Sequence, residues 1–145
     1  MTDLKLLALD GEDLEVISAT TQDSCVRVGD MGYVQSERRF ALLMNRYAWE
    51  AGDPRGRGVR KRAGLHFDRV TAVEARGINL EARDGVLELL AITFAETDPP
   101  GGTVELAFAG GGTIRLSVEV LEARLKDLGA AWGAKAQPRH ELDKV

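Results

Sequence analysis

The side chains best suited to binding chemistry form a dense basic group near the middle of the chain. Arg55, Arg57, Arg60, Lys61 and Arg62 lie in a segment rich in glycine, residues 51–62. The planar guanidinium group of arginine presents its donors in a fork that matches carboxylates and phosphates. The sequence therefore predicts an anion-binding loop for a phosphorylated ligand, a nucleic acid or an acidic protein surface. The alternative is a solvated loop whose charges only keep it soluble.

The distribution of charge supports a local site rather than a generally basic protein. The chain of 145 residues has 19 Lys and Arg against 23 Asp and Glu, a net charge of −4. Residues 38–69 nevertheless carry 9 basic and 3 acidic side chains, whereas the segments before and after them are net acidic. The negative total argues against a dedicated nucleic-acid binder. The charge distribution is still compatible with a local anion-binding surface.

A second candidate is the pair His66 and Asp68, which are two residues apart on an expected strand and so share one face. Such a pair could line a pocket for a small molecule or support acid–base catalysis. Two ligands without a third make a weak metal site, and an ordinary strand histidine is the competing interpretation. We expect no metal site, no cofactor and no catalytic residues, because neither a phosphate-binding P-loop nor a nucleophile elbow occurs.

The elements that must position these residues begin with a strand and a helix. Leu4–Leu9 is apolar and short enough for a strand, and Asp10 then offers a helix N-cap with Asp13 three residues on. Leu14, Ile17 and Thr21 mark the inner side of a helix that ends near Gln22.

From Cys25 the hydrophobic period changes to two, which is typical of strands with one buried face. Gly29-Asp30 and Asp84-Gly85 are hairpin signals, and the glycines at 110–112 predict a third turn. Phe40, Leu42 and Met44 are expected to share the buried face of a strand over 38–49. The remaining strands are predicted over 25–28, 31–35, 64–76, 86–95, 104–108 and 114–120.

The chain is expected to close with an amphipathic helix. Val118, Leu121, Leu125 and Leu128 recur at helical spacing, and Gly129 stands where a helix-terminating glycine belongs. The predicted class is α+β, mainly antiparallel β. About seven meandering strands curl into a barrel like that of pleckstrin-homology domains, or into a sandwich. The N-terminal strand and helix open this single domain, residues 1–136, and residues 137–145 form a flexible tail.

The compartment follows from what the sequence lacks. Cys25 is the only cysteine, so no internal disulfide can form. The simplest interpretation of Cys25 is a small buried side chain with a structural role. The first residues lack the basic start and long apolar run of a signal peptide, and no window reaches the ~18 apolar residues of a membrane span. We expect a cytoplasmic protein with no membrane span.

Four segments of the chain resemble an uncharacterised alphaproteobacterial family, the domain-of-unknown-function family DUF2948. They are DLKLLALDGEDLEVISATTQD (3–23), VGDMGYVQSERRFALLMNRYAWE (28–50), AGLHFDRV (63–70) and GGTVELAFAGGGTIRLSVEVLEARLKDLGAAW (101–132). The resemblance implies a small cytoplasmic bacterial protein. It carries over no activity, ligand or catalytic residue.

The function that these observations favour is a non-enzymatic binding or adaptor module of unknown partner. Its contact surface is expected to be the arginine-rich loop and the neighbouring strand ends. A small-molecule-binding or enzymatic domain, with its site in a barrel mouth near His66, is the alternative. A subunit of a homo-oligomer is a third possibility, which an exposed apolar face would indicate.

Overall fold

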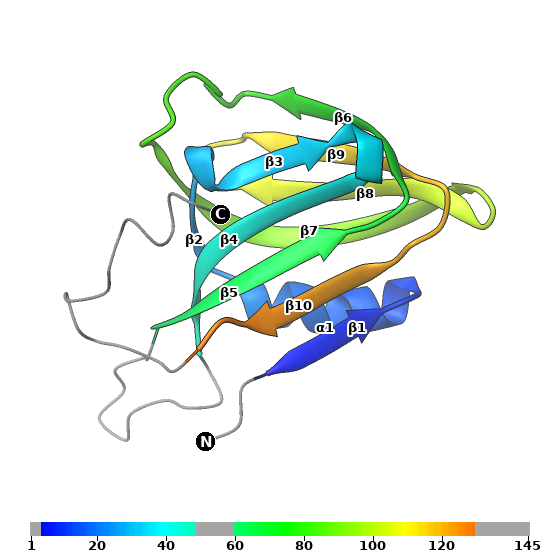
Figure 1. Cartoon of the computed structure of the whole chain (residues 1–145), viewed down its shortest axis with the longest axis horizontal. Helices are drawn as coiled ribbons and strands as arrows, with labels where there is room; N and C mark the ends of the chain where they lie inside the picture. Colours follow the sequence, from blue (N-terminus) through cyan, green and yellow to red (C-terminus); the bar gives the residue numbers. More distant parts are fainter. Residues whose placement is uncertain (1–3, 49–59, 130–145) are drawn as a thin grey trace.

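A single antiparallel β-sheet makes up most of the molecule (Figure 1). The computed structural model describes residues 4–48 and 60–129. Ten strands pair in the order β1-β10-β5-β4-β2-β7-β8-β9-β6, and β3 lies against β4 off this path. The sheet is not closed, because β1 and β6 stand at its ends and no pairing within the described ranges joins them.

The first half of the chain contributes five strands and the helix, and the second half five more strands. The elements are β1 (Lys5–Ala8), α1 (Gly11–Thr21), β2 (Cys25–Arg27), β3 (Met31–Val34), β4 (Arg39–Tyr47), β5 (Arg60–Phe67), β6 (Val70–Arg76), β7 (Val86–Asp98), β8 (Gly101–Phe108), β9 (Thr113–Val118) and β10 (Ala123–Asp127). Single 3-10 turns, Val28–Asp30 and Gln35–Glu37, precede β3 and β4.

Both halves of the sheet face one hydrophobic core. Leu42 and Leu65 from β4 and β5 belong to the same buried cluster as Leu106 from β8 and Leu116 from β9. The alternation along these strands explains the arrangement, since every second side chain points inward. β2 joins the two halves by pairing with β4 on one side and β7 on the other.

The helix α1 forms as the sequence predicts. The Asp10 carboxylate accepts a hydrogen bond from the Asp13 N–H at 2.8 Å, which caps the first turn. Leu14, Ile17 and Thr21 are buried, so this side of the helix packs into the core. In Figure 1 the helix lies behind β10 and β1, which leaves the other side of these strands facing the viewer.

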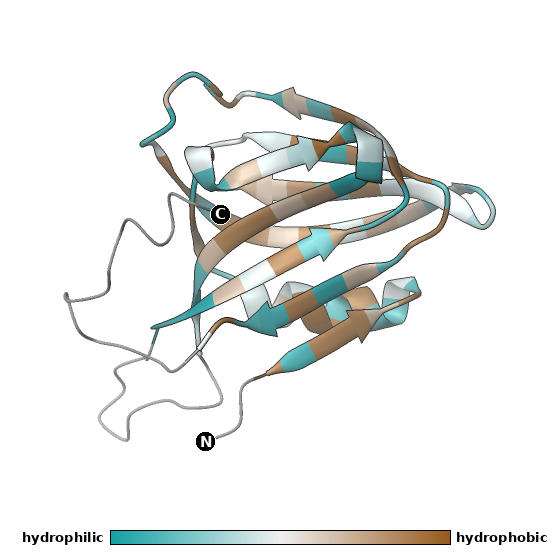
Figure 2. Cartoon of the chain, in the orientation of Figure 1, coloured by the Kyte–Doolittle hydropathy of each residue, from teal (hydrophilic) through white to brown (hydrophobic). Residues whose placement is uncertain are grey.

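The predicted closing helix is wrong. Ala123–Asp127 form β10, which pairs with both β1 and β5. Leu121, Ala123, Leu125 and Asp127 are buried while the residues between them are not, a period of two. Figure 2 shows this alternation of hydrophilic and hydrophobic residues along β10. Leu121 and Leu125 are four residues apart, a spacing that fits one face of a strand and also one face of a helix. The helix was predicted for this reason.

Two of the three predicted hairpins are also wrong. Cys25 lies opposite Asn45 and Met31 opposite Leu42, so β2 and β3 continue along one edge of β4 rather than pairing. Asp84-Gly85 does not join neighbours either, because β6 pairs with β9 whereas β7 pairs with β2 and β8. The glycine turn at 110–112 is confirmed, since it joins the paired strands β8 and β9.

The sheet therefore has ten strands instead of about seven. A barrel or a sandwich was expected, and the sheet is not closed into a barrel. The α+β, mainly antiparallel class is confirmed. The predicted tail, residues 137–145, lies outside the described residues. No helix in the part of the chain that the structure describes has the length and apolarity to cross a membrane.

Candidate functional site

The predicted anion-binding residues divide into three groups in the structure. Arg55 and Arg57 lie outside the described residues. Arg60, Lys61 and Arg62 were expected in the loop but begin β5, where Arg60 lies opposite Tyr47 and Lys61 opposite Arg46. Because alternate strand residues point to opposite sides, Lys61 faces the core and its two neighbours point to the outer side, where Arg60 is partly exposed and the Arg62 side chain is only 7% exposed.

Lys61 belongs to a buried group of charges. The Asp127 carboxylate accepts hydrogen bonds from Arg46 Nε at 2.8 Å and Nη2 at 2.9 Å, and a third from the Leu4 N–H at 3.0 Å. Lys61 Nζ lies 3.9 Å from the same carboxylate, and all three charged side chains are almost fully buried. Burial alone would raise the pKa of Asp127. The hydrogen bonds and charges of its neighbours outweigh burial and hold the pKa below its ordinary 3.8.

Arg60 and Arg62 are on the outer side and are held by their surroundings. The Arg60 guanidinium lies 5.1 Å from the centre of the Tyr47 ring and donates to the carbonyl oxygens of Asp23 and Asn45. Arg62 donates to Asn45 Oδ1 at 3.1 Å and Asp30 Oδ2 at 3.2 Å. These contacts fix both arginines to the sheet.

The outward side chains of β1, β10, β5 and β4 form what we call the basic face. The basic residues on it are Lys5, Arg39, Arg60, Arg124 and Lys126, together with Arg62, whose side chain is bound to Asn45 and Asp30 and is only 7% exposed. Its other members are Leu7, Ala41, Leu43, Asn45, Tyr47, Gly64 and His66. No acidic residue of these four strands points outward. The carboxylates that pair with the arginines come from adjoining turns, such as Asp30 and Asp68.

Two lysines of the basic face lie directly opposite one another. Lys5 of β1 is in register with Lys126 of β10, and both residues are exposed. Neither has an ion pair with any of the residues that the structure describes. Like charges directly opposite in a sheet are destabilising, so this pair is not explained by the stability of the fold.

The middle of the basic face is apolar. Leu128 and Leu43 lie beside Gly64 of β5, which has no side chain of its own. A Cβ atom at Gly64 would lie 3.5 Å from Leu128 Cδ1 and 3.7 Å from Leu43 Cδ2. Leu128 is 46% exposed, and Leu7, beside Arg124, is 48% exposed. Apolar side chains therefore lie between the basic ones, an arrangement that suits contact with another macromolecule.

The structure brings His66 and Asp68 together at one end of the basic face. His66 Nε2 is 3.6 Å from Asp68 Oδ2, and the same carboxylate binds Arg39 Nε at 2.8 Å and Arg124 Nη1 at 3.2 Å. Nε2 is buried and has no hydrogen-bond partner among the described residues. Burial, with the charges of Arg39 and Arg124, lowers the pKa of His66 below 6.5 despite the opposing charges of Asp68 and Glu122.

The shifted pKa of His66 predicts a pH-dependent stability. The unfolded chain binds the histidine proton more readily than the folded chain, so the stability due to neutral His66 is complete above pH 6.5. It decreases as the pH falls through 6.5. Urea unfolding at about pH 5, 6 and 7 should give a flatter curve for His66→Gln than for the wild type. Equal slopes for the two proteins would contradict this prediction.

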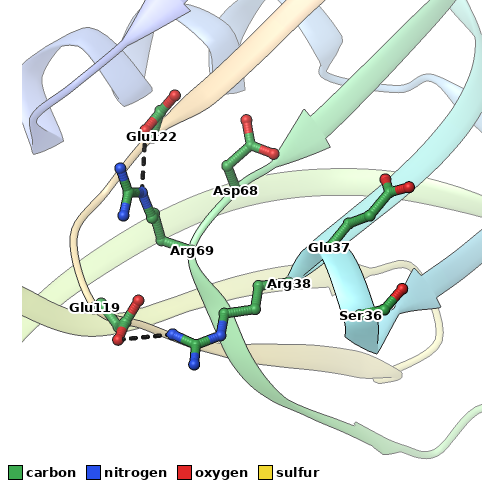
Figure 3. A pocket seen from close by; sticks show the side chains of 7 residues that line it. All are labelled: Ser36, Glu37, Arg38, Asp68, Arg69, Glu119 and Glu122. Atoms are coloured by element: carbon green, nitrogen blue, oxygen red, sulfur yellow. Dashed lines mark hydrogen bonds and ion pairs between the residues drawn. The ribbon is translucent and has the colours of Figure 1, made fainter.

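A polar pocket of about 350 Å³ adjoins Asp68 at the corner between β5 and β6 (Figure 3). We call it the corner pocket. It is formed by three connections, and its lining residues are Ser36, Glu37, Arg38, Asp68, Arg69, Glu119 and Glu122. Of the predicted pair, Asp68 lines this pocket and His66 does not. Arg38 and Arg69 have left-handed backbone conformations, with φ of 52° and 62°.

The predicted site lacked four basic residues of the basic face: Lys5, Arg39, Arg124 and Lys126. The signal was present, because Glu122, Arg124 and Lys126 alternate with buried residues. Assigning the segment to a helix placed these charges on a solvated helical side and hid their alignment with β5 and β1. The pairing of Lys5 with Lys126 joins residues at opposite ends of the chain, which no local pattern indicates.

Comparison with known proteins gives a family but no activity. The described residues contain no cluster of three or more His, Cys, Asp or Glu side chains arranged to hold a metal ion. No curated protein and no solved structure matches the chain significantly. A family model described as a protein of unknown function, DUF2948, matches residues 4–140. Because this match covers nearly all of the chain, the protein belongs to the DUF2948 family.

Proposed function

We propose that the chain is a non-enzymatic binding module that holds an acidic protein segment on its basic face. The observation that carries the proposal is the in-register pair Lys5 and Lys126, exposed and without an acidic partner in the described part of the chain. A carboxylate placed between the two ammonium groups would relieve their repulsion. Binding of a carboxylate would therefore be favourable, because it removes a repulsion that remains in the free protein.

The charge of the whole face supports the same partner. Five accessible basic side chains, those of Lys5, Arg39, Arg60, Arg124 and Lys126, point outward from four adjacent strands, in a chain whose net charge is −4. Asp68 pairs with Arg39 and Arg124, so the positive charge that no described carboxylate compensates lies at Lys5, Arg60 and Lys126. This charge attracts an acidic segment and repels a basic one. Arg55 and Arg57 stay in the proposal as further anion-binding residues outside the described ranges.

The apolar centre of the face favours a protein segment over a nucleic acid. Leu7, Leu43 and Leu128 offer surface for apolar side chains, which an acidic peptide can supply and a phosphate backbone cannot. Tyr47 is the aromatic residue on the face, and Arg60 covers its ring, so it offers little for base stacking. The proposed partner is therefore a segment that combines Asp or Glu with apolar residues.

Charge reversal at Lys126 separates binding from stability. Lys126→Glu places opposite charges in register, so the free energy of unfolding should rise by about 0.2–1 kcal/mol. The same change should weaken binding of a fluorescein-labelled peptide rich in Glu and Leu by about tenfold or more, because attraction becomes repulsion. Fluorescence anisotropy at low and high salt measures the affinity, and urea unfolding measures the stability.

The matched control is Arg76→Glu on β6, which makes the same charge change on an exposed residue of the other half of the sheet. It should leave peptide binding within about twofold of the wild type. Equal losses in the two variants would mean that only the net charge matters, and the proposed face would be wrong. A second peptide with Gln in place of Glu tests the need for carboxylates.

A small-molecule site near His66 is the second candidate function. The corner pocket, which Asp68 lines beside His66, is the observation that favours it.

A further inference from the structure

We propose that the corner pocket binds a small zwitterion, a molecule that carries a carboxylate and a protonated amine. The inference rests on the second candidate function, the small-molecule site, and not on the basic face. The corner pocket has a volume of about 350 Å³, which is within the range of small-molecule pockets. Residues from three connections line it. Both signs of charge line it, which is the feature that the ligand must match.

The donors come from Arg38 and Arg69. Arg38 Nη1 lies 3.0 Å from Glu119 and Arg69 Nε lies 3.8 Å from Glu122, and both side chains are more than half exposed. Each guanidinium has five N–H donors, and its other nitrogens make no hydrogen bond or ion pair with residues in the described ranges. A ligand carboxylate can therefore bind both arginines while their exposed ion pairs stay in place or exchange at little cost.

The acceptors come from Ser36 and Glu37. Neither side chain has a hydrogen bond or ion pair with the part of the chain that the structure describes. Figure 3 shows Arg38 and Arg69 turned toward Glu119 and Glu122, with Ser36 and Glu37 on the other side of the pocket. A protonated amine on the ligand would have the Glu37 carboxylate and the Ser36 hydroxyl as acceptors.

A ligand of one sign fits this lining poorly. The pocket has two guanidinium groups and four carboxylates, those of Glu37, Asp68, Glu119 and Glu122. Asp68, Glu119 and Glu122 are already paired with arginines, including Arg39 and Arg124 from outside the pocket. A simple anion would still meet the Glu37 carboxylate, and a simple cation would meet the two guanidinium groups. A molecule with both charges satisfies the two sides together, and rejection of single-signed ions gives the site its specificity.

Backbone hydrogen bonds hold the main chain of the two arginines in place before any ligand arrives. Left-handed conformations are uncommon for residues other than Gly, Asn and Asp. Here the Arg38 carbonyl accepts the Val70 N–H at 2.9 Å, and the Arg69 carbonyl accepts the Glu119 N–H at 3.0 Å. These bonds join the three connections around the pocket. A fixed main chain reduces the entropy that is lost when a ligand binds at this corner.

The proposal is tested by titrating the ¹⁵N-labelled protein with glycine, γ-aminobutyrate and 6-aminohexanoate, which differ in the separation of their charges. Acetate, methylammonium and inorganic phosphate are the single-signed probes. At least one zwitterion should shift the signals of residues 36–38 and 68–69 saturably, with an affinity about tenfold or more above every single-signed probe. Equal or tighter binding of acetate or phosphate would overturn the proposal, and so would the absence of saturable binding by any zwitterion.

Three variants sharpen the result. Glu37→Gln should remove the advantage of the zwitterion over acetate, whereas Arg69→Asn should weaken both and keeps a residue that tolerates the left-handed conformation. Arg115→Asn, which breaks an exposed pair with Glu105 on β8 and β9, is the control and should change neither affinity. A dispersed amide spectrum shows that each variant is folded. Lys126→Glu should not affect this site, so failure here is distinguishable from failure of the basic face.

Discussion

Asp127→Asn lowers the free energy of unfolding by about 3–5 kcal/mol, because it removes the carboxylate from a buried group of charges. Asp127 accepts two hydrogen bonds from Arg46 and one from the Leu4 N–H, and Lys61 is near the same oxygen. The amide keeps the shape of the side chain but not its charge. Arg46 and Lys61 then lose the carboxylate that lies against them in the buried group. Equilibrium unfolding in urea measures the change.

Acid should have a related effect on the wild type. The pKa of Asp127 lies below 3.8 in the folded chain, so the stability that the carboxylate contributes is complete above pH 3.8. It is lost as the pH falls through the pKa of the folded state. Asp127→Asn cannot show this loss, and its unfolding curve should depend less on pH in that range.

The control is Asp84→Asn, which removes a carboxylate that is 97% exposed and 3.4 Å from Arg27. Exposed ion pairs contribute little, so this variant should change the unfolding free energy by no more than about 0.5 kcal/mol. A loss below about 1 kcal/mol for Asp127→Asn would show that the buried group does not depend on its carboxylate.

Gly102→Ala is the second change with a large expected effect. It should lower the free energy of unfolding by about 3 kcal/mol or more. A Cβ atom at Gly102 would collide with the Ala95 carbonyl oxygen, and it would lie 2.8 Å from Phe94 Cε1 and 2.9 Å from Glu96 Cα. Two of these contacts are with backbone atoms of the paired strand β7, which cannot turn aside as a side chain can. β7 and β8 must separate there to accommodate the methyl group, next to the register shift between Glu96 and Asp98.

Gly32→Ala is the matched control for this substitution. Gly32 is in β3, an exposed strand position with no atom within 4 Å of the added Cβ and no positive φ. Its replacement should be neutral or slightly stabilising, because alanine restricts the unfolded chain. If both variants unfold at the same urea concentration, the close approach of β7 to β8 is not as described.

Local signals in the sequence predicted the elements whose pattern has a single interpretation. The capped helix from Asp10 carries a polar cap and three inward residues at helical spacing, and β4 alternates over nine residues. The residues 121–128 fit both a strand and a helix. Only their pairing with β1 and β5 decides between the two, and that pairing is a property of the whole fold.

The same limit applies to the candidate site. The excess of basic residues in 38–69 is visible in the sequence, and it does form much of the basic face through Arg39, Arg60 and Arg62. Lys61 is next to them in sequence but faces inward, because side chains alternate along β5. The basic face was completed by Lys5 and Lys126, whose contribution depends on a register between the two ends of the chain.

The most direct test of the binding function is to map where an acidic peptide contacts the protein. Amide signals of the ¹⁵N-labelled chain are followed while the Glu- and Leu-rich peptide is added at low salt. The basic face predicts shifts at Lys5, Leu7, Leu43, Gly64 and Lys126 that salt reverses, with the signals of α1 and of β8 and β9 unchanged. Shifts centred on another surface, or no saturable shift on these strands, would contradict the proposed function.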